Sequence, residues 1–146
     1  MKKKLLKTAG IAAILAFAAT AAAATDLATA KQYCKLAGKD PMQAIDNCTK
    51  VIESSGTQDQ VQAYNFRGRA YLVHGWLDMS LADFNAALKL DPNSALLHNN
   101  RALVLRQLGR YDEALAGHDR AISLDKGNEH YQRTREKTLE RKGRGS

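Results

Sequence analysis

The sequence contains few of the residues that build metal sites and catalytic centres. Its 146 residues include two cysteines and four histidines, and no two histidines stand three or four residues apart. Neither an H-E-x-x-H nor a C-x-x-C motif is present, and there is no glycine-rich phosphate loop. A zinc site needs several ligands that converge on one point. The sequence therefore predicts no catalytic residue, no metal site and no cofactor, and we expect a protein that is not an enzyme.

Long apolar runs are also scarce, and the one that exists lies at the start of the chain. Four lysines within the first seven residues precede an apolar stretch, which ends in small residues up to Ala24. This order is typical of an export signal, so we expect a signal peptide at residues 1–24 and a mature chain in the periplasm. The alternative is an uncleaved anchor, because the uncharged run from Thr8 to Thr25 is just long enough to span a membrane. No transmembrane segment is expected in the mature chain.

Positive charge is concentrated at the two ends of the chain, although the formal net charge is +7. Residues 126–146 hold seven Lys or Arg and three Glu, whereas residues 25–125 hold 11 Lys or Arg and 12 Asp or Glu. A nucleic-acid-binding protein needs positive charge clustered on one face of its fold, so no nucleic-acid partner is expected. The basic C-terminal segment has two interpretations. Its cations favour the end of a helix, or they bind an anionic lipid or polymer.

The middle of the chain repeats the same pattern of residues about every 34 positions, as from Asn65 to Asn99. Tyr64, Gly68 and Tyr71 share one helical face, and Gly75 is suited to end that helix. A helix–turn–helix unit of about 34 residues with this content resembles the tetratricopeptide repeat. The resemblance implies an all-α, right-handed α-solenoid. The residues that recur in phase include Asn65 and Asn99, Arg67 and Arg101, Gly75 and Gly109, Asp78 and Asp112, Leu81 and Leu115, and Ala87 and Ala121.

This period divides the mature chain into four parts. We expect a degenerate first repeat at residues 25–60, clear repeats at residues 61–94 and 95–128, and a basic capping helix and tail at residues 129–146. The division implies seven helices, which form three hairpins and a cap. A two-helix unit cannot bury both of its faces alone, so stacked neighbours share one continuous core. Within each hairpin, small residues such as Gly68 and Ser80 let the two helices approach closely.

The ends of the first helices are predicted from capping and breaking residues. We expect helices at residues 26–37 and 40–54, the second with Asp40 as its N-cap and Pro41 in its first turn. Gln43 can close a capping box with Asp40. The next hairpin is expected at residues 60–74 and 78–90, with Asp78 as the cap of its second helix.

The two cysteines are expected on facing helices of the first hairpin. Cys34 and Cys48 lie about two helical turns on either side of the turn at Lys39 and Asp40. In an oxidising compartment a bridge between them closes a loop of about 15 residues, which stabilises the fold by roughly 3 kcal/mol in the loop-entropy model. We favour this disulfide over the alternative, which is a pair of reduced and buried thiols.

Three charged or titratable positions are interpreted as structural. Arg67 and Arg101 occupy the same repeat position beside close-packed small residues, and Asp83 is within reach of either. A structural ion pair is favoured there over a ligand site, because a charge at such a position needs a partner. His118 stands where Phe84 stands one repeat earlier, so we expect a histidine of the core rather than a ligand.

The resemblance further implies a concave surface, lined by the first helix of each hairpin, that holds an extended peptide or a partner's helix. Asparagine amides offer a donor and an acceptor to a peptide backbone, and arginines hold carboxylates. The alternative is an ordinary solvated face. Some family members clamp a C-terminal carboxylate with five polar residues, of which only Asn100 is matched here. The groove positions are Asn65, Phe66, Arg69, Val73, Asn99, Asn100, Leu103 and Arg106, with His130, Arg133 and Lys137 from the capping helix.

These patterns together predict a monomeric, non-catalytic adaptor or scaffold of the cell envelope, with a protein or peptide as its partner. The alternative function is a membrane-tethered module whose basic C-terminal helix binds an anionic surface or polymer. The two hypotheses differ in where the ligand is held, because the first uses the groove and the second uses the end of the chain.

Overall fold

The computed structural model of this chain describes residues 26–36 and 39–144. The signal peptide predicted at residues 1–24 lies outside the described residues. The described part is all-helical, with a helix at residues 26–34 followed by six more and no strand. The later helices are α2 (Pro41–Ser54), α3 (Thr57–Val73), α4 (Leu77–Leu90), α5 (Ala95–Gln107), α6 (Tyr111–Leu124) and α7 (Glu129–Arg144).

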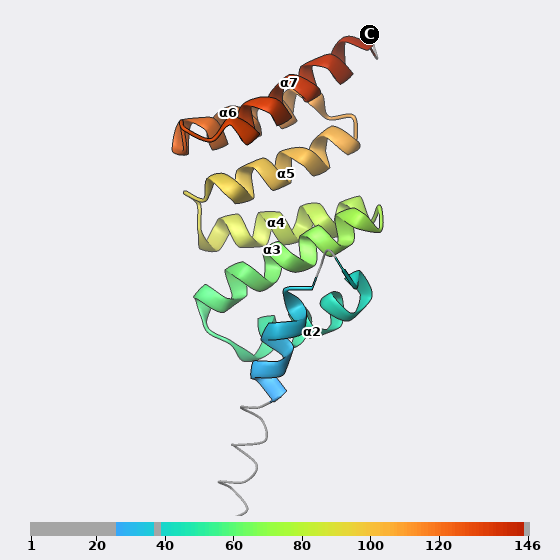
Figure 1. Ribbon diagram of the computed structural model, residues 1–146, viewed down its shortest axis with the longest axis vertical. Helices are drawn as coiled ribbons and strands as arrows, with labels where there is room; N and C mark the ends of the chain where they lie inside the picture. The colour runs from blue at the N-terminus through green and yellow to red at the C-terminus, as the bar shows by residue number, and fades with distance from the viewer. Residues whose placement is uncertain (1–25, 37–38, 145–146) are drawn as a thin grey trace, which may run out of the picture.

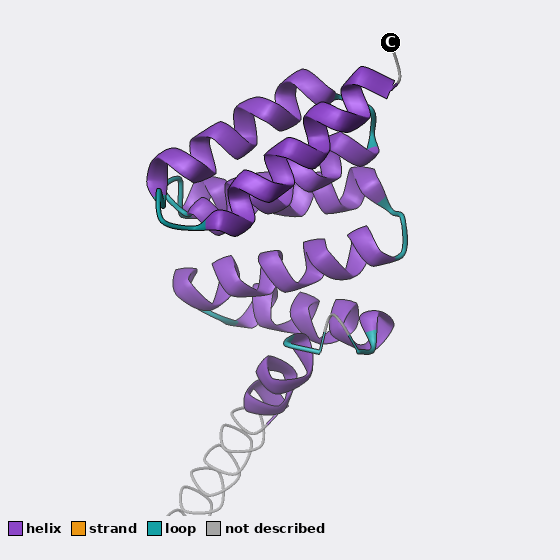
Figure 2. Ribbon diagram, turned by 45° about the horizontal axis from the view of Figure 1, so that its top comes forward, coloured by secondary structure: helices purple, strands orange, loops and turns teal. Residues whose placement is uncertain are grey.

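The helices stack in the order of the sequence to form one elongated array (Figure 1). Each helix from α2 to α7 packs against the next, and α5 also contacts both α3 and α7. We call the helix at residues 26–34, α3, α5 and α7 the A helices, and α2, α4 and α6 the B helices. A second view shows the helices of the array joined by short loops (Figure 2). The predicted solenoid of three hairpins and a cap is confirmed.

Glycine ends the A helices of the two clear repeats with the same turn. Gly75 and Gly109 both have φ of 75°, a backbone conformation that residues with a side chain rarely adopt. The amide of Trp76 donates to the Tyr71 carbonyl at 2.9 Å, and the matching amide of Arg110 donates to the carbonyl of the equivalent residue at 2.9 Å. This tight turn reverses the chain, so the B helix starts only two residues after the glycine.

That early start changes the role predicted for Asp78. The N-cap of α4 is Trp76, whose side chain makes no capping bond, and Asp78 lies within the first turn. The turn at Gly75 leaves a single residue before the helix, which is too few to place Asp78 at the cap. Its carboxylate still favours the positive end of the helix dipole.

The cap predicted for α2 is confirmed. Asp40 is the N-cap, Pro41 follows at the first helical position, and Asp40 Oδ1 accepts a hydrogen bond from the Gln43 amide at 3.1 Å. In contrast, α3 starts at Thr57, three residues before the predicted start at residue 60. Gly56 is extended there, so the polar residues that follow it form a first turn instead of a connecting loop.

Small residues bring the two helices of each hairpin close together, as predicted. A Cβ atom added to Gly68 meets three ring carbons of Phe84 at 3.1 to 3.3 Å, and Phe84 itself is fully buried. Ser80 Oγ donates to the Gly68 carbonyl at 2.7 Å, which joins the same pair of helices. In the next hairpin the glycine has changed sides, because an added Cβ on Gly117 meets the Ala102 Cβ at 3.0 Å.

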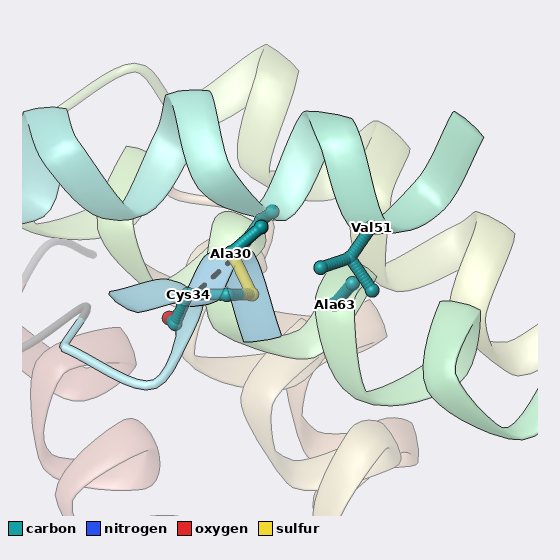
Figure 3. Packing of buried hydrophobic residues seen from close by; sticks show 5 residues of the cluster. Ala30, Cys34, Val51 and Ala63 are labelled. Carbon is teal, nitrogen blue, oxygen red and sulfur yellow. Dashed lines mark hydrogen bonds between the residues drawn. A yellow bond between two sulfur atoms is a disulfide. The ribbon is translucent and has the colours of Figure 1, made fainter. Parts of the chain in front are cut away.

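A disulfide joins Cys34 to Cys48 in the first hairpin, with their Cα atoms 4.7 Å apart. Both cysteines are buried in an apolar cluster with Ala30, Val51 and Ala63 (Figure 3). Val51 and Ala63 come from α2 and α3, so this cluster connects the first hairpin to the next repeat. The predicted bridge is therefore present, and it lies in the core of the repeat that has the fewest large apolar residues.

Candidate functional site

The predicted groove residues of α3 and α5 meet through a pair of asparagines. Asn100 Nδ2 donates to Asn65 Oδ1 at 2.9 Å, which bridges two successive A helices. Each side chain is 8% exposed. The bond uses one donor hydrogen and one acceptor lone pair, so both amides keep further hydrogen-bonding capacity, including that of the Asn65 amide nitrogen and the Asn100 carbonyl oxygen. The arrangement places two oriented amides at the junction of two repeats.

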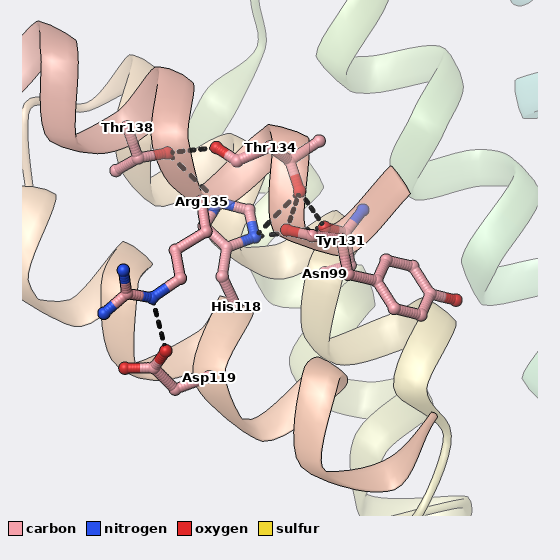
Figure 4. Close-up of polar contacts among 7 residues, drawn as sticks. All are labelled: Asn99, His118, Asp119, Tyr131, Thr134, Arg135 and Thr138. Atoms are coloured by element: carbon pink, nitrogen blue, oxygen red, sulfur yellow. Dashed lines mark hydrogen bonds and ion pairs between the residues drawn. The ribbon is translucent and has the colours of Figure 1, made fainter. Parts of the chain in front are cut away.

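Asn99 does not share that surface, although the repeat pattern predicts it in the groove. Its side chain is 1% exposed. Asn99 Oδ1 accepts a hydrogen bond from Thr134 Oγ1 at 2.8 Å and lies 3.0 Å from His118 Nδ1 (Figure 4). The amide thus ties α5 to α6 and α7 inside the array. Its counterpart Asn65 accepts the equivalent bond from Asn100, so what the sequence did not reveal is the added contact with His118, which stands where the earlier hairpin has Phe84.

His118 is a core residue, as predicted, and it is the centre of this buried polar cluster. Its side chain is fully buried, and Nε2 lies 3.1 Å from Thr138 Oγ1 on α7. Since the Asn99 oxygen can only accept, His118 Nδ1 carries the hydrogen in this assignment. Burial, reinforced by the charge of Arg106, lowers the pKa of His118 to about 4. The ring is therefore neutral at pH 7, and its two nitrogens connect side chains of α5 and α7.

Cations gather where α5 approaches α7. The side chain of Arg106 is half-buried, and its Nε has no hydrogen-bond partner within the described residues. Burial lowers the pKa of Arg106, and the nearby charge of Arg141 lowers it further. Two guanidinium groups that repel each other in a partly desolvated place favour an anion that would relieve the repulsion. Arg106 was predicted for the groove, whereas Arg141 was not.

Arg141 could have been found from helical spacing. It follows Arg133 and Lys137 at intervals of four, so the three cations share one face of α7. The groove positions predicted from the sequence include Arg133 and Lys137 and omit Arg141. Arg133 is exposed and bonds to Glu129 at 3.2 Å.

The remaining predicted groove residues differ in exposure. Arg69 is exposed on α3, while Phe66 and Leu103 are half-buried. Phe66 also packs against the apolar clusters of the first hairpin. A small pocket of about 60 Å³ lies beside Phe66 and Gln62, and the ion pair between Lys31 and Asp59 (2.7 Å) borders it. The groove surface therefore combines an apolar end near Phe66 with a cationic end near Arg106.

The structural ion pair predicted for Arg67 is confirmed. Its Nε and Nη2 each donate to a carboxylate oxygen of Asp83 at 2.8 Å, and its Nη1 donates to Thr49 at 2.8 Å. Hydrogen bonding to Asp83 raises the pKa of Arg67. Arg101 differs from the expectation, because its Nη1 reaches Asn85 at 3.4 Å instead of Asp83. Asp83 is fully engaged by Arg67, which comes from the helix of its own hairpin.

The described residues hold no helix that is long and apolar enough to cross a membrane. Within the same ranges, no group of three or more His, Cys, Asp and Glu residues is placed to hold a metal ion.

Comparison with known proteins agrees with this architecture. The tetratricopeptide repeat matches the chain at residues 61–94 and again at residues 84–116. The Arabidopsis OM64 TPR domain superposes with a TM-score of 0.72 at 21% identity, over 80% of this chain and 96% of that one. The fold is a tetratricopeptide-repeat solenoid. A yeast structure, the TPR2B domain of Sti1 in complex with pHsp70, superposes on the solenoid with a TM-score of 0.70 at 19% identity, over 84% of this chain and 99% of that one.

Two curated proteins also share sequence with the solenoid. Stress-induced-phosphoprotein 1 of Caenorhabditis elegans is 36% identical over 59 residues, and DnaJ homolog subfamily C member 7 of Mus musculus is 26% identical over 76 residues. These segments cover 40% and 52% of this chain. They span only 18% and 15% of the two relatives, so the similarity is confined to a small part of each relative.

Proposed function

We propose that this chain is a non-catalytic adaptor that binds an acidic, extended segment of another protein along its A helices. The observation that carries the proposal is the pair of Arg106 and Arg141, two cations in mutual repulsion, one of which has a buried Nε without a partner in the described ranges. An acidic side chain or a chain terminus placed between them would accept charge-assisted hydrogen bonds. The bridged amides of Asn65 and Asn100 lie between α3 and α5, with Asn100 on the same helix as Arg106, and they suit a peptide backbone.

The similar proteins support the same role. The superposed yeast domain is in complex with pHsp70, and this chain shares its repeat architecture. Stacked helical repeats leave an extended surface that many such proteins use for binding. The similarity to these proteins is confined to the repeat, so it does not identify the sequence of the bound peptide.

Peptide binding measured by fluorescence anisotropy tests the proposal. Acidic peptides with free and with amidated C-termini should bind at low salt, and binding should weaken as salt rises. Substituting both Arg106→Gln and Arg141→Gln should weaken the affinity by about tenfold or more, because the anion then loses both of its charged donors.

The matched control removes the same charge elsewhere. Lys89→Gln together with Lys126→Gln changes two exposed cations outside the groove and should leave the affinity unchanged. Equal losses of affinity in the two double variants would show that only net charge matters, which would refute a groove site. Equal binding of free and amidated C-termini would assign the contact to acidic side chains.

The outer surface of α7 is less suited to hold a polyanion. Its cations pair with carboxylates at Arg135–Asp119, Lys142–Asp112 and Arg144–Glu140. A polyanion would have to compete with these local carboxylates. We therefore place the anionic ligand in the groove and not on an anionic surface bound by the C-terminal helix.

We further propose that the adaptor works outside the cytoplasm, in the periplasm, after removal of residues 1–24. The buried disulfide supports this location, because such bonds persist in oxidising compartments. Intact-mass analysis of the native protein should give a chain that starts at Thr25 with both cysteines blocked to alkylation. A full-length mass with two free thiols would contradict the proposal.

A further inference from the structure

Three arginines, Arg67, Arg101 and Arg135, stand one repeat apart on successive A helices, and each reaches back to the preceding B helix. The residues they reach also occupy equivalent places in the repeats, so the array contains a ladder of matching contacts. The contacts are Arg67 to Thr49 at 2.8 Å, Arg101 to Asn85 at 3.4 Å and Arg135 to Asp119 at 2.5 Å.

The two outer arginines of this ladder hold a carboxylate, and the middle one does not. Arg67 has Asp83 from its own hairpin, and Arg135 has Asp119. For Arg101 the position equivalent to Asp83 is Gly117, which has no side chain to offer. The Nε of Arg101 is buried and has no hydrogen-bond partner in the described part of the chain. A buried guanidinium donor of this kind costs free energy unless an acceptor reaches it.

An open cavity of about 390 Å³ lies at Arg101. Its walls come from three helices and a cap: Leu81 and Asn85 of α4, Arg101 and Leu105 of α5, Glu113 and Ala116 of α6, and Arg110 just before α6. Such a volume falls in the range of small-molecule sites, which combine apolar walls with a few polar groups. None of these residues belongs to the groove proposed above, so the cavity is a separate place on the array.

The charges around the cavity are unequal. Arg110 binds Glu113 through two hydrogen bonds of 2.7 and 2.8 Å, so the carboxylate of Glu113 is already held. Arg101 lowers the pKa of Glu113 as well, although less than Arg110 does. Arg101 is therefore the cation of the cavity wall whose guanidinium is not hydrogen-bonded to a carboxylate of the described residues. The charges of Arg110 and Glu113 balance each other.

We propose that this cavity binds a carboxylate group, which gives Arg101 the kind of partner that Arg67 has in Asp83. The group is carried either by a glutamate side chain of a partner or by a free short-chain carboxylic acid. The apolar walls at Leu81 and Leu105 hold its aliphatic part, and the guanidinium of Arg101 binds the charge through a fork of two parallel bonds. This site would allow the adaptor to bind a second ligand while its groove is occupied.

Nuclear magnetic resonance titration of the ¹⁵N-labelled protein tests the site. Butyrate should shift the Arg101 Nε–H signal and the backbone amides of Asn85 and Glu113, with a Kd of about 1 to 10 mM, as suits so small a ligand. Butyramide has the same shape without the charge and should cause no shift. Inorganic phosphate should bind more weakly than butyrate, because it has no aliphatic part to fill the apolar wall.

Three variants separate the site from general charge effects. Arg101→Gln and Asn85→Asp should each weaken butyrate binding by about tenfold, the first by removing the fork and the second by giving Arg101 a carboxylate of its own, as Asp119 does for Arg135. Asn85→Asp changes a surface residue with little change of shape, so it reports on the site even if Arg101→Gln folds poorly. Arg69→Gln, in the groove, should bind butyrate as the parent protein does.

A pair of capped tripeptides, with a central glutamate or a central glutamine, identifies the source of the carboxylate. Stronger binding of the glutamate peptide than of butyrate points to a partner's side chain, and butyrate binding without peptide binding points to a free acid. Both outcomes support the site. No shift with either probe, equal shifts with butyramide, or unchanged affinity in Asn85→Asp would overturn it.

Discussion

At the scale of single residues, a histidine takes the place of a core phenylalanine and brings hydrogen-bonding needs with it. Phe84 fills its hairpin with a ring, whereas His118 is equally buried and holds Asn99 and Thr138 from the two neighbouring A helices. The substitution exchanges apolar packing for a polar link between the last repeat and the capping helix. A buried polar network of this kind favours one specific arrangement of its helices.

This link predicts a loss of stability in mild acid. The pKa of His118 is lowered to about 4 by burial, while an unfolded chain has the ordinary value near 6.5. The unfolded state therefore binds the proton first, and stability falls as the pH drops from about 6.5 to 4, by up to roughly 3 kcal/mol. Of the charged groups that face the ring, Arg106, Arg135 and His130 strengthen the effect, and Asp119 opposes it.

Urea unfolding at pH 7 and pH 4.5 measures this loss. The His118→Gln variant lacks the titrating group, so the difference between the parent and the variant isolates its contribution from that of the carboxylates. If both proteins lose the same stability over this interval, His118 is not responsible.

The ion pair of Arg67 and Asp83 leads to a second prediction at this scale. Asp83 is 5% exposed, so Asp83→Asn would leave a partly buried guanidinium with a weaker acceptor. We expect a loss of about 2 to 4 kcal/mol in the free energy of unfolding. Arg133→Gln breaks an exposed pair and should cause no measurable change. Thermal or urea unfolding of the two variants makes the comparison, and equal stabilities would count against a buried pair.

At the scale of the helix, the hairpin of α3 and α4 and the hairpin of α5 and α6 each depend on one position without a side chain. Gly68 admits the Phe84 ring in one hairpin, and Gly117 admits Ala102 in the next. The small residue thus lies on the A helix in the first case and on the B helix in the second. Both hairpins have a close approach between their two helices. In each hairpin, a side chain of the facing helix fills the space that the glycine leaves.

Gly68→Ala tests this close approach. Alanine favours a helix over glycine by about 0.5 to 1 kcal/mol. Here, however, the added Cβ meets three carbons of a rigid, buried ring at 3.1 to 3.3 Å. We expect the steric effect to win, with a net destabilisation of about 1 to 2 kcal/mol. Gly127→Ala meets nothing within 4 Å and should be neutral or slightly stabilising. A Gly68→Ala protein as stable as the parent would show that the ring can move away at little cost.

At the scale of the whole molecule, the solenoid is a linear series in which each repeat contacts only its neighbours. The described helices contact the next in sequence, and the A helices also contact the A helices beside them. Stability in such an array is close to a sum of repeat and interface terms, so a weak end can open alone. The first hairpin is that end, because small residues form much of its core and a disulfide closes it.

Replacing both cysteines therefore has a local effect. Cys34→Ala with Cys48→Ala should lower stability by about 3 kcal/mol, because the unfolded chain gains the freedom of an open loop. Hydrogen exchange should rise in residues 26–54 while α4 to α7 keep their protection. Reduction of the parent protein should have the same effect. Uniform loss of protection along the whole array would mean that the repeats unfold as one unit.

The sequence by itself determined the features that depend on local spacing. The regular interval between equivalent residues located the hairpins, the glycines at 75 and 109 located the turns, and Asp40 with Pro41 located the start of α2. Each of these follows from contacts within a few residues along one helix or turn, which a linear pattern records directly. The disulfide belongs with them, because two cysteines on either side of one turn have few other places to go.

Only the tertiary structure decided which equivalent residues have equivalent partners. Asn65 and Asn99 each accept a hydrogen bond from the next A helix, but only Asn99 also contacts a buried histidine, because His118 stands where the earlier hairpin has Phe84. Arg67 and Arg101 likewise share a position, and only the first has a carboxylate. Such contacts cross between helices, so they depend on the side chain that a different repeat supplies, and a period in the sequence specifies the position without specifying that partner.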